Sequence, residues 1–427
     1  MRGDRLAVLL ALSLVASACG SSAPSTAPSP AALSTLPPPP DELGLGWVSV
    51  LDVERPPDAF EIPEDPSAGQ DTGTSGHPLH FPGQAMIEDV VATPDGLVAI
   101  GYVGFEWRPV AWHTDDPRRW ALTEIGRVEP DEAAFAVALA VTPAGEAVAV
   151  GRAGRRPAVW RSGDGGRTWR HTEPPVLGSD DDWERMTAVA GNGTTMIAGG
   201  SVGPELLERR ARFWTSGDGG AWQPVPDDPA AFDGTEVVDI VALPAGGWLA
   251  IGRIGDGQRT TGSVAWTSGD GRTWLRQEPA AFADARVRAA LVRGDGSIVA
   301  VGSRVDETMA LGWVSRDGGA TWTLTAEQDS LRYGDGWKIV MTDVVEVDGG
   351  LVAVGNVVPL QHGQGMAWRS RDGLRWERSP VQPALGGAEP LAAVAVDGSV
   401  IAVGTAGSPD NFIPRVWISP PGAAAAG

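Results

Sequence analysis

The sequence contains few of the residues that form covalent cross-links or act as nucleophiles. Among 427 residues, Cys19 is the only cysteine, Lys338 is the only lysine, and Tyr102 and Tyr333 are the only tyrosines. A single thiol excludes an intrachain disulfide and a cysteine-rich metal site. The P-loop patterns GxxxxGKS and GxxxxGKT are absent as well, which argues against P-loop nucleotide chemistry.

Positive charge is scarce relative to negative charge. The chain has 33 lysines and arginines against 54 aspartates and glutamates, and its formal net charge is −21. A surface of this sign is repelled by phosphate backbones, so nucleic acid is not an expected partner. The histidines are His77, His80, His113, His171 and His362, and no acidic series of the calcium-loop type occurs. We therefore expect neither a metal nor another cofactor.

Long hydrophobic runs are missing beyond the N-terminus. Residues 6–15 form one apolar run, broken only by Ser13, behind the basic residues Arg2 and Arg5. A run of this length is too short to cross a bilayer as a helix and is typical of a secretory signal peptide. We therefore interpret residues 1–18 as a signal peptide.

The small residues 16–18 lead directly to Cys19, and this segment resembles the bacterial lipobox. The resemblance implies cleavage before Cys19, lipidation of its sulfur, and anchoring to the extracytoplasmic side of the cell membrane. A plain secreted protein that is cut nearby is the alternative. Residues 19–45 are rich in Ser, Ala and Pro and are expected to form an extended stalk.

The strongest feature that is present is an internal repeat. A run of β-branched and small residues that ends in glycine occurs seven times, at intervals of 49–53 residues. The copies end at Gly101, Gly151, Gly200, Gly252, Gly302, Gly355 and Gly404. Each copy follows another apolar stretch across a turn rich in Gly, Asp or Asn, which is typical of a β-hairpin. Alternation of bulky and small residues within each run suits closely packed sheets.

A third predicted strand follows each copy and ends in tryptophan. These residues are Trp112, Trp160, Trp214, Trp266, Trp313, Trp368 and Trp417. Six of them lead into a tight turn and a further tryptophan, as in SGDGGRTW at 162–169, whereas TDDPRRW at 114–120 is a degenerate copy. These turns resemble the Asp-box of bacterial-neuraminidase repeats, known from sialidase-like and sortilin-like propellers. In such turns Ser and Asp cap backbone N–H groups, and the tryptophan packs between sheets.

The repeat predicts an all-β fold, a seven-bladed β-propeller of four-stranded antiparallel blades over residues 46–419. The seventh copy has no fourth strand, whereas the segment that starts at Trp47 resembles the outer strands of other repeats. We therefore expect residues 46–53 to complete the last blade and close the ring, which leaves no long open edge. Eight blades, with this strand counted separately, is the alternative. Residues 420–427 are expected to be a disordered tail.

The Asp-box resemblance assigns its residues a structural role, on the side of the propeller away from a ligand. They are Ser162, Asp164, Gly166, Trp169, Ser216, Asp218, Trp222, Ser268, Asp270, Trp274, Ser315, Asp317, Trp322, Ser370, Asp372 and Trp376. The same resemblance implies that ligand contacts come from the loops of the opposite face. The candidates there are Glu106, Trp107, Arg108, Arg155, Asp182, Trp183, Arg209, Arg253, Tyr333 and Trp337. Aromatic and charged residues together suit sugar or peptide recognition, and a solvated rim is the alternative.

Two functions remain open. The first is a non-catalytic propeller, expected to be monomeric, that binds a protein, peptide or glycan outside the membrane. The second, implied by the Asp-box resemblance, is a sialidase-like exo-glycosidase acting on extracellular glycans. That chemistry uses three arginines around a carboxylate and a tyrosine paired with a glutamate. Only Tyr102 and Tyr333 can serve as the tyrosine, and the Arg-Ile-Pro motif of that family is absent near the first blade.

Overall fold

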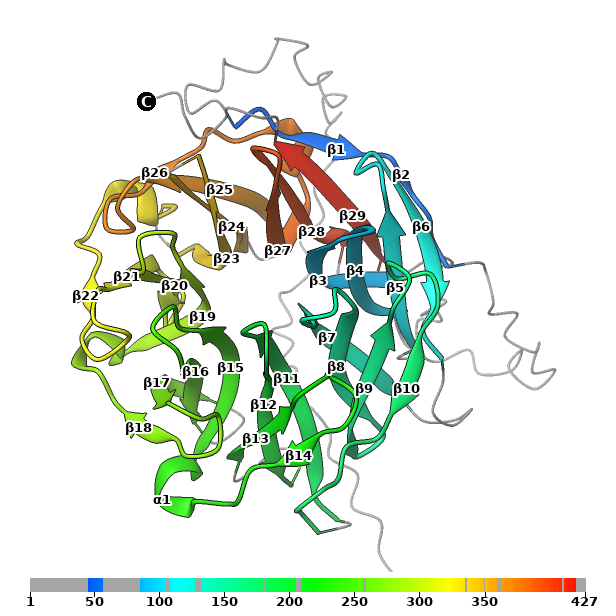
Figure 1. Ribbon diagram of the computed structural model, residues 1–427. Coiled ribbons are helices and arrows are strands. Elements are labelled where there is room, and N and C mark those ends of the chain that lie inside the picture. The colour runs from blue at the N-terminus through cyan, green and yellow to red at the C-terminus, as the bar shows by residue number, and fades with distance from the viewer. Residues whose placement is uncertain are drawn as a thin grey trace, which may run out of the picture. The chain divides into compact units, whose positions relative to one another are not determined.

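The described residues of this computed structural model form a ring of blades (Figure 1). They are residues 45–56, 85–103, 108–126, 133–179, 181–204, 209–255, 259–334, 336–348, 350–358, 363–408 and 411–419. All of them belong to the second of two compact units, Pro39–Gly427. Seven sheets surround a central axis, and the first strand of each lies nearest to it. The predicted seven-bladed propeller of four-stranded antiparallel blades is therefore confirmed.

Each blade runs from an inner strand beside the axis to a short outer strand. Blade 1 consists of β3 (Ala85–Thr93), β4 (Gly96–Val103), β5 (Arg108–Thr114) and β6 (Arg119–Glu124). Blade 2 consists of β7 (Ala134–Val141), β8 (Ala147–Ala153), β9 (Arg156–Ser162) and β10 (Arg170–Thr172). Blade 3 consists of β11 (Trp183–Gly191), β12 (Met196–Gly203), β13 (Arg210–Ser216) and β14 (Gln223–Pro224). Blade 4 consists of β15 (Thr235–Ala242), β16 (Trp248–Gly255), β17 (Thr260–Ser268) and β18 (Leu275–Gln277). Blade 5 consists of β19 (Ala285–Val292), β20 (Ile298–Arg304), β21 (Ala310–Ser315) and β22 (Thr323–Leu324). Blade 6 consists of β23 (Lys338–Val347), β24 (Gly350–Val358), β25 (Gln364–Ser370) and β26 (Glu377–Arg378). Blade 7 consists of β27 (Ala388–Val396), β28 (Ser399–Ser408), β29 (Asn411–Ser419) and β1 (Val48–Val50).

The N-terminal segment closes the ring by pairing with two blades. β1 pairs antiparallel with β29, as expected for the outer strand of the last blade. The strand predicted over 46–53 is nevertheless interrupted at Leu51, and β2 (Asp52–Val53) pairs parallel with β6 of blade 1. The hydroxyl of Ser419 also donates to the Leu45 carbonyl at 2.5 Å. The segment therefore joins the last blade to the first, instead of serving blade 7 alone.

The glycine that ends each repeated run is required by a bulge in the inner strand. In all seven blades, the pairing of the first two strands slips by one residue directly after the inner-strand residue that pairs with this glycine. The bulge brings an inner-strand carbonyl oxygen so close that a Cβ on the glycine would lie 1.7 to 2.5 Å from it. No side chain fits at that separation, so the backbone itself accounts for the repeated glycine.

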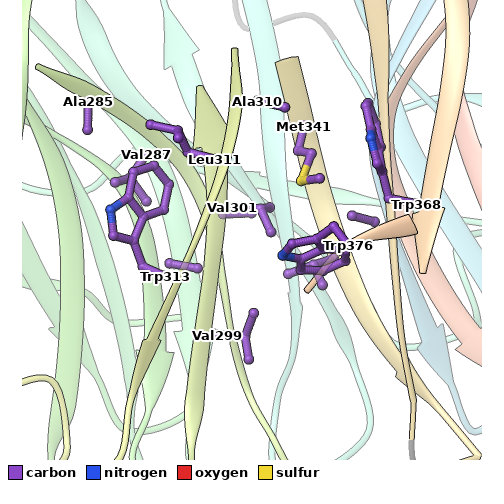
Figure 2. Close-up of a cluster of buried hydrophobic side chains, with 14 of the residues drawn as sticks. Ala285, Val287, Val299, Val301, Ala310, Leu311, Trp313, Met341, Trp368 and Trp376 are labelled. Atoms are coloured by element: carbon purple, nitrogen blue, oxygen red, sulfur yellow. The ribbon is translucent and has the colours of Figure 1, made fainter. Parts of the chain in front are cut away.

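The core consists of the interfaces between neighbouring blades. Figure 2 shows the interface of blades 5 and 6, where Val301 lies near Met341 and Trp376, whereas Trp313 lies on the other side of blade 5, near Val287. The seven tryptophans that were predicted to end the third strands lie two residues before the strand ends, and none has any exposed surface. Aromatic side chains of this size contribute a large share of buried apolar area, so the repeated tryptophan is a principal source of stability.

Six of these tryptophans also connect their blade to the segment that precedes it. Their indole N–H groups donate to backbone carbonyls, for example from Trp266 to Ala231 at 2.9 Å and from Trp313 to Ala281 at 2.7 Å. The acceptors include residues of the short helical turns α1 (Pro229–Phe232), η2 (Ala280–Phe282), η3 (Asp329–Leu331) and η4 (Pro383–Leu385). In the described part of the chain, the indole N–H of Trp160 has no partner.

Helices contribute little to this unit. In the described residues, no helix has the length and apolar character needed to cross a membrane. The predicted signal peptide 1–18, Cys19, nearly all of the stalk and the predicted tail at 420–427 lie outside the described residues.

Candidate ligand-binding cavity

The two faces of the ring carry different parts of each blade. The start of every second strand pairs with the end of the third strand. The hairpins between first and second strands therefore share a face with the turns after the third strands, and we name it the turn face. The opposite face, named the cavity face, carries the loops between second and third strands and the segments that join the blades.

On the turn face, five turns with the sequence Ser-x-Asp-Gly organise their own backbone. In the first of them, Ser162 Oγ accepts from Gly166 N at 2.8 Å, and Asp164 Oδ1 accepts from Thr168 N at 2.9 Å. Trp169 donates its indole N–H to the Gly166 carbonyl at 2.9 Å. The same three kinds of bond recur in the turns that begin at Ser216, Ser268, Ser315 and Ser370.

These bonds occupy the acceptors of the turn carboxylates. Burial alone would raise the pKa of Asp164, but hydrogen bonds from its own turn lower that pKa to about 2. The pKa of Asp317 is also lowered, chiefly by hydrogen bonds from Thr321. The charge of each carboxylate is thus stabilised within the turn, which fits the structural role expected for these residues.

On the cavity face, equivalent positions of the seven blades carry different residues. Two positions before the bulge, the inner strands place Met86, Phe135, Arg185, Glu236, Arg286, Val340 and Glu389. Directly after the repeated glycine, the second strands place Tyr102, Arg152, Ser201, Arg253, Ser303, Asn356 and Thr405. Arginine occurs at these positions in blades 2 to 5, so the repeat gathers positive charge on one part of the ring.

Glu236 is the centre of a cluster of arginines from blades 3 and 4. Its carboxylate lies 2.5 Å from Arg209 Nη1 and 2.7 Å from Arg253 Nε. Arg185 also pairs with it, and the hydroxyl of Ser201 donates to it at 3.1 Å. The Glu236 side chain is only 4 % exposed, whereas that of Arg253 is 39 % exposed. Three cations around one buried carboxylate leave a surplus of positive charge facing outward.

This cluster forms one side of a cavity of about 210 Å³ between blades 4 and 5, which we name the main cavity because it holds most of the arginines discussed below. The charged residues that line it are Arg209, Glu236, Arg253, Arg259, Arg286 and Arg288. Thr235 and Thr260 add hydroxyl groups, and the apolar contribution comes from Val238 and Val287. The lining is therefore mainly cationic and polar.

A second carboxylate, Glu307, holds the cations on the other side of the cavity. Its Oε1 lies 2.5 Å from Arg286 Nη1 and 3.3 Å from Arg288 Nη2, and its Oε2 lies 3.2 Å from Lys338 Nζ. Glu307 lies in the loop between β20 and β21, where its carbonyl accepts from Ile339 N at 2.7 Å. Among the described residues, the Nε groups of Arg286 and Arg288 find no hydrogen-bond partner.

The electrostatics of the cavity favour a bound anion. Burial would raise the pKa of Glu236, but Arg185, Arg253 and Arg209 lower it, so this carboxylate is ionised. Burial lowers the pKa of Arg288, and the nearby charges of Arg286 and Arg253 lower it further. Like charges therefore repel one another across the cavity, and an anion placed between them would relieve that repulsion.

A smaller cavity of about 80 Å³ shares Arg209 with the first one. Arg152, Trp183 and Arg185 also line it. The guanidinium carbons of Arg152 and Arg155 lie 4.7 and 5.2 Å from the centre of the Trp183 ring, which is cation–π geometry. Positive charge thus continues from blade 4 into blades 3 and 2.

The residues predicted for the ligand face fall into several groups. Arg209 and Arg253 line the main cavity. Trp183 lines the smaller cavity, and Arg155 stacks on Trp183. Asp182 lines a neighbouring hollow that also includes Arg209. Tyr333 and Trp337 pack edge to face with ring centres 5.4 Å apart, on the segment between blades 5 and 6. Arg108 is buried and pairs with Glu124 at 2.5 Å. Glu106 and Trp107 lie outside the described residues.

Sequence reasoning missed Arg185, Glu236, Arg286 and Arg288. They belong to inner strands, whereas ligand contacts were sought in the loops. A signal for them was present in the inner strands. Arg185, Glu236 and Arg286 occupy the same position of the repeat, and Arg288 follows two residues later. The clearest example is ARVRAALV at 285–292.

Blade 1 holds a tyrosine–glutamate pair close to its bulge. Glu88 lies on β3 and Tyr102 on β4. The Tyr102 hydroxyl donates to Met86 Sδ at 3.1 Å, and burial raises the pKa of Glu88 to about 7. Burial and the Glu88 charge also raise the pKa of Tyr102. The Tyr102 ring packs edge to face with Phe135 at 5.2 Å, and Arg152 lies over Phe135 at 4.3 Å. A chain of contacts thus leads from this pair to the smaller cavity.

Three further carboxyl groups link inner strands of neighbouring blades. Asp89, Asp239 and Asp343 follow the bulges of blades 1, 4 and 6, and each accepts a backbone N–H of the next blade at 2.6 to 2.7 Å. Burial raises their pKa values to about 8, 7 and 6, respectively. In the part of the chain that the structure describes, no three His, Cys, Asp or Glu side chains are grouped as a metal site.

Fold and site together define a β-propeller with an arginine-lined cavity on one face. The chain matches no protein-family model and no curated protein sequence. Solved structures similar to it include a Trypanosoma rangeli sialidase (TM-score 0.46, 12 % identity, covering 80 % of this chain and 55 % of that one). Another is a GH43 β-1,3-galactosidase (TM-score 0.37, 15 % identity, covering 57 % and 58 %). The chain spans about half the length of the sialidase, and the likeness concerns the course of the backbone alone.

Proposed function

We propose that this protein is a lipid-anchored, extracytoplasmic lipoprotein whose propeller binds a glycan or peptide through an anionic group of that ligand. The observation that carries the proposal is the main cavity, lined by five arginines and one carboxylate in a chain of net charge −21. Guanidinium groups recognise carboxylates and related anions by paired, charge-assisted hydrogen bonds. The turns that resemble Asp-boxes serve the fold on the opposite face.

The arginines are already held in place before a ligand arrives. Glu236 and Glu307 fix the guanidinium groups of Arg209, Arg253 and Arg286 at hydrogen-bond distance. Side chains that are fixed in advance lose less conformational entropy on binding, so more of the interaction energy contributes to affinity. This arrangement suits a recognition site that works without catalysis.

Titration calorimetry with galacturonate, and with galactose as the neutral analogue, tests the proposal. We expect galacturonate to bind and galactose to bind much more weakly. Arg253→Gln should weaken galacturonate binding about tenfold or more, because one charge-assisted hydrogen bond contributes about 1.5–3 kcal/mol. Arg375→Gln, at an exposed arginine of the turn face, is the matched control and should bind as the native protein does. Unchanged affinity of Arg253→Gln for every acidic sugar and acidic peptide tested would contradict the proposal.

The anchor is supported by the resemblance of residues 16–19 to a lipobox. Two or more acyl chains hold a protein on a bilayer stably, whereas one chain binds only marginally. Cys19→Ser should therefore release the protein from the membrane fraction and abolish incorporation of a palmitate analogue. Continued labelling of that variant would show that the lipid is attached elsewhere.

Glycoside hydrolysis is the second candidate, because Glu88 lies within electrostatic reach of Tyr102. A sialidase-like reaction uses a tyrosine with a glutamate and three arginines around a substrate carboxylate. Here three arginines do converge, but on Glu236 of the protein itself. A panel of fluorogenic sialosides and other glycosides separates the two functions. Turnover by the native protein that disappears in Glu88→Gln would favour the enzyme.

A further inference from the structure

Two cationic centres of the same design contribute arginines to the main cavity. Glu236 holds Arg185, Arg209 and Arg253, and Glu307 holds Arg286, Arg288 and Lys338. The first centre comes from blades 3 and 4, and the second comes from blade 5 and the first residue of blade 6. In each centre, three cations surround one carboxylate that is mostly buried. Two carboxylates against six cations leave four positive charges without a counterpart in this set.

Each centre presents a guanidinium group to solvent. The Arg253 side chain is 39 % exposed and that of Arg288 is 36 % exposed, and both line the same cavity. The charge of Arg253 contributes to the lowered pKa of Arg288, which places the two cations within electrostatic reach of each other. A ligand with one anionic group compensates only part of this charge, whereas two anionic groups would engage both centres.

The lining favours a sugar over a peptide as the carrier of those groups. Val238 and Val287 are the apolar side chains among the described lining residues, and no aromatic side chain belongs to that lining. Peptide recognition usually depends on apolar or aromatic anchors that fill matching pockets. Arginines with Thr235 and Thr260 instead offer charged and hydroxyl groups, which suit a ligand rich in hydroxyl and carboxylate groups.

We infer that the main cavity recognises an acidic oligosaccharide through two anionic groups at once. One group binds Arg253, which Glu236 holds, and the other binds Arg286 and Arg288, which Glu307 holds. This inference rests on the proposed function and adds the number of anionic groups and the class of ligand to it. No bond is formed or broken, because recognition consists of ion pairs and hydrogen bonds.

The test compares galacturonate with digalacturonate and trigalacturonate by titration calorimetry at low salt. The native protein should bind digalacturonate about tenfold or more tightly than galacturonate, since a second charge-assisted contact is added. Arg288→Gln should lose most of this advantage, so that this variant binds digalacturonate and galacturonate with similar affinities. Arg253→Gln should weaken both ligands, and Arg375→Gln should change neither.

A second variant guards against a loss of structure. Lys338 is 59 % exposed and also pairs with Glu307, so Lys338→Gln perturbs the same centre from the solvent side. It should reduce the digalacturonate advantage in part, and its thermal unfolding should match that of the native protein.

The outcomes separate this inference from the proposed function. A digalacturonate advantage that survives Arg288→Gln and Lys338→Gln overturns the two-centre inference, while binding that still depends on Arg253 leaves the proposed function intact. Loss of any dependence on Arg253 overturns both. A tetraglutamate peptide that binds more tightly than trigalacturonate, and equally depends on Arg288, overturns the assignment to a sugar.

Discussion

The two faces of the propeller use charged residues in opposite ways. On the turn face, five blades repeat the same serine and aspartate, and each side chain is bound by the backbone of its own turn. On the cavity face, equivalent positions carry residues as different as Phe135, Glu236 and Arg286. Some of their partners come from another blade, as when Arg185 of blade 3 pairs with Glu236 of blade 4.

This contrast helps to distinguish residues that serve the fold from residues that form a site. A residue that recurs in every blade satisfies a need that every blade has, such as a capped turn or a filled interface. A residue that differs between blades at equivalent positions serves no need that all blades share. The cluster around Glu236 and Glu307 contains such residues, and it draws on blades 3 to 6.

The largest expected effect comes from breaking the bulge that underlies the cavity face. A Cβ at Gly302 would lie 2.1 Å from the Arg286 carbonyl oxygen. Gly302→Ala should therefore destabilise the fold by about 3 kcal/mol or more, as expected for overpacking against backbone. It should also displace Arg286 and weaken anion binding, measured by urea unfolding and calorimetry. Gly269→Ala on the turn face, where a Cβ meets nothing within 4 Å, is the control and should change stability little.

The ring itself could be predicted from the sequence, whereas the cavity could not. Seven glycine-ended runs and seven tryptophans at similar intervals indicate the number of blades, because each copy serves the same local purpose. The closing strand was predicted in part, since Leu51 divides it between two blades. Arg209 and Arg253 were found because they lie at strand ends near loops. Their common partner, Glu236, could not be inferred, because convergence across blades depends on the geometry of the closed ring.

A smaller effect is expected on the turn face, and it should leave binding untouched. Asp317 accepts from Thr321 N at 2.9 Å and from the Thr321 hydroxyl at 2.5 Å. Asp317→Ala removes these bonds and should lower the free energy of unfolding by about 1 kcal/mol. Its affinity for an anionic ligand should equal that of the native protein. Arg253→Gln should show the reverse, with weaker binding and nearly native stability. Weakened binding by Asp317→Ala would contradict the assignment of ligand binding to the cavity face alone.

The smallest expected effect concerns the pH dependence of stability, which has opposite signs for turn and inner-strand carboxylates. The pKa of Asp164 is lowered to about 2, so its contribution to stability is present above its ordinary pKa near 4 and is lost as pH falls toward 2. The pKa of Asp239 is raised to about 7 by burial, so the folded state retains a proton that the unfolded state has released. Its contribution is therefore lost as pH rises from about 4 through 7.

Urea unfolding between pH 5 and pH 8 separates the inner-strand groups from the turn carboxylates, because the turn carboxylates are ionised throughout that range. The unfolding midpoint of the native protein should fall as pH rises, since Asp89, Asp239 and Asp343 all have raised pKa values. Asp239→Asn removes one titration and keeps a carbonyl oxygen that can accept a backbone N–H, so its midpoint should fall less steeply over the same range. The quantity compared is the change of the unfolding midpoint with pH, so a difference in absolute stability between the two proteins does not affect the result. An equal slope in both proteins would mean that Asp239 is ionised in the fold, and that its bond to Ala290 N, like the bonds of the turn face, stabilises the charge.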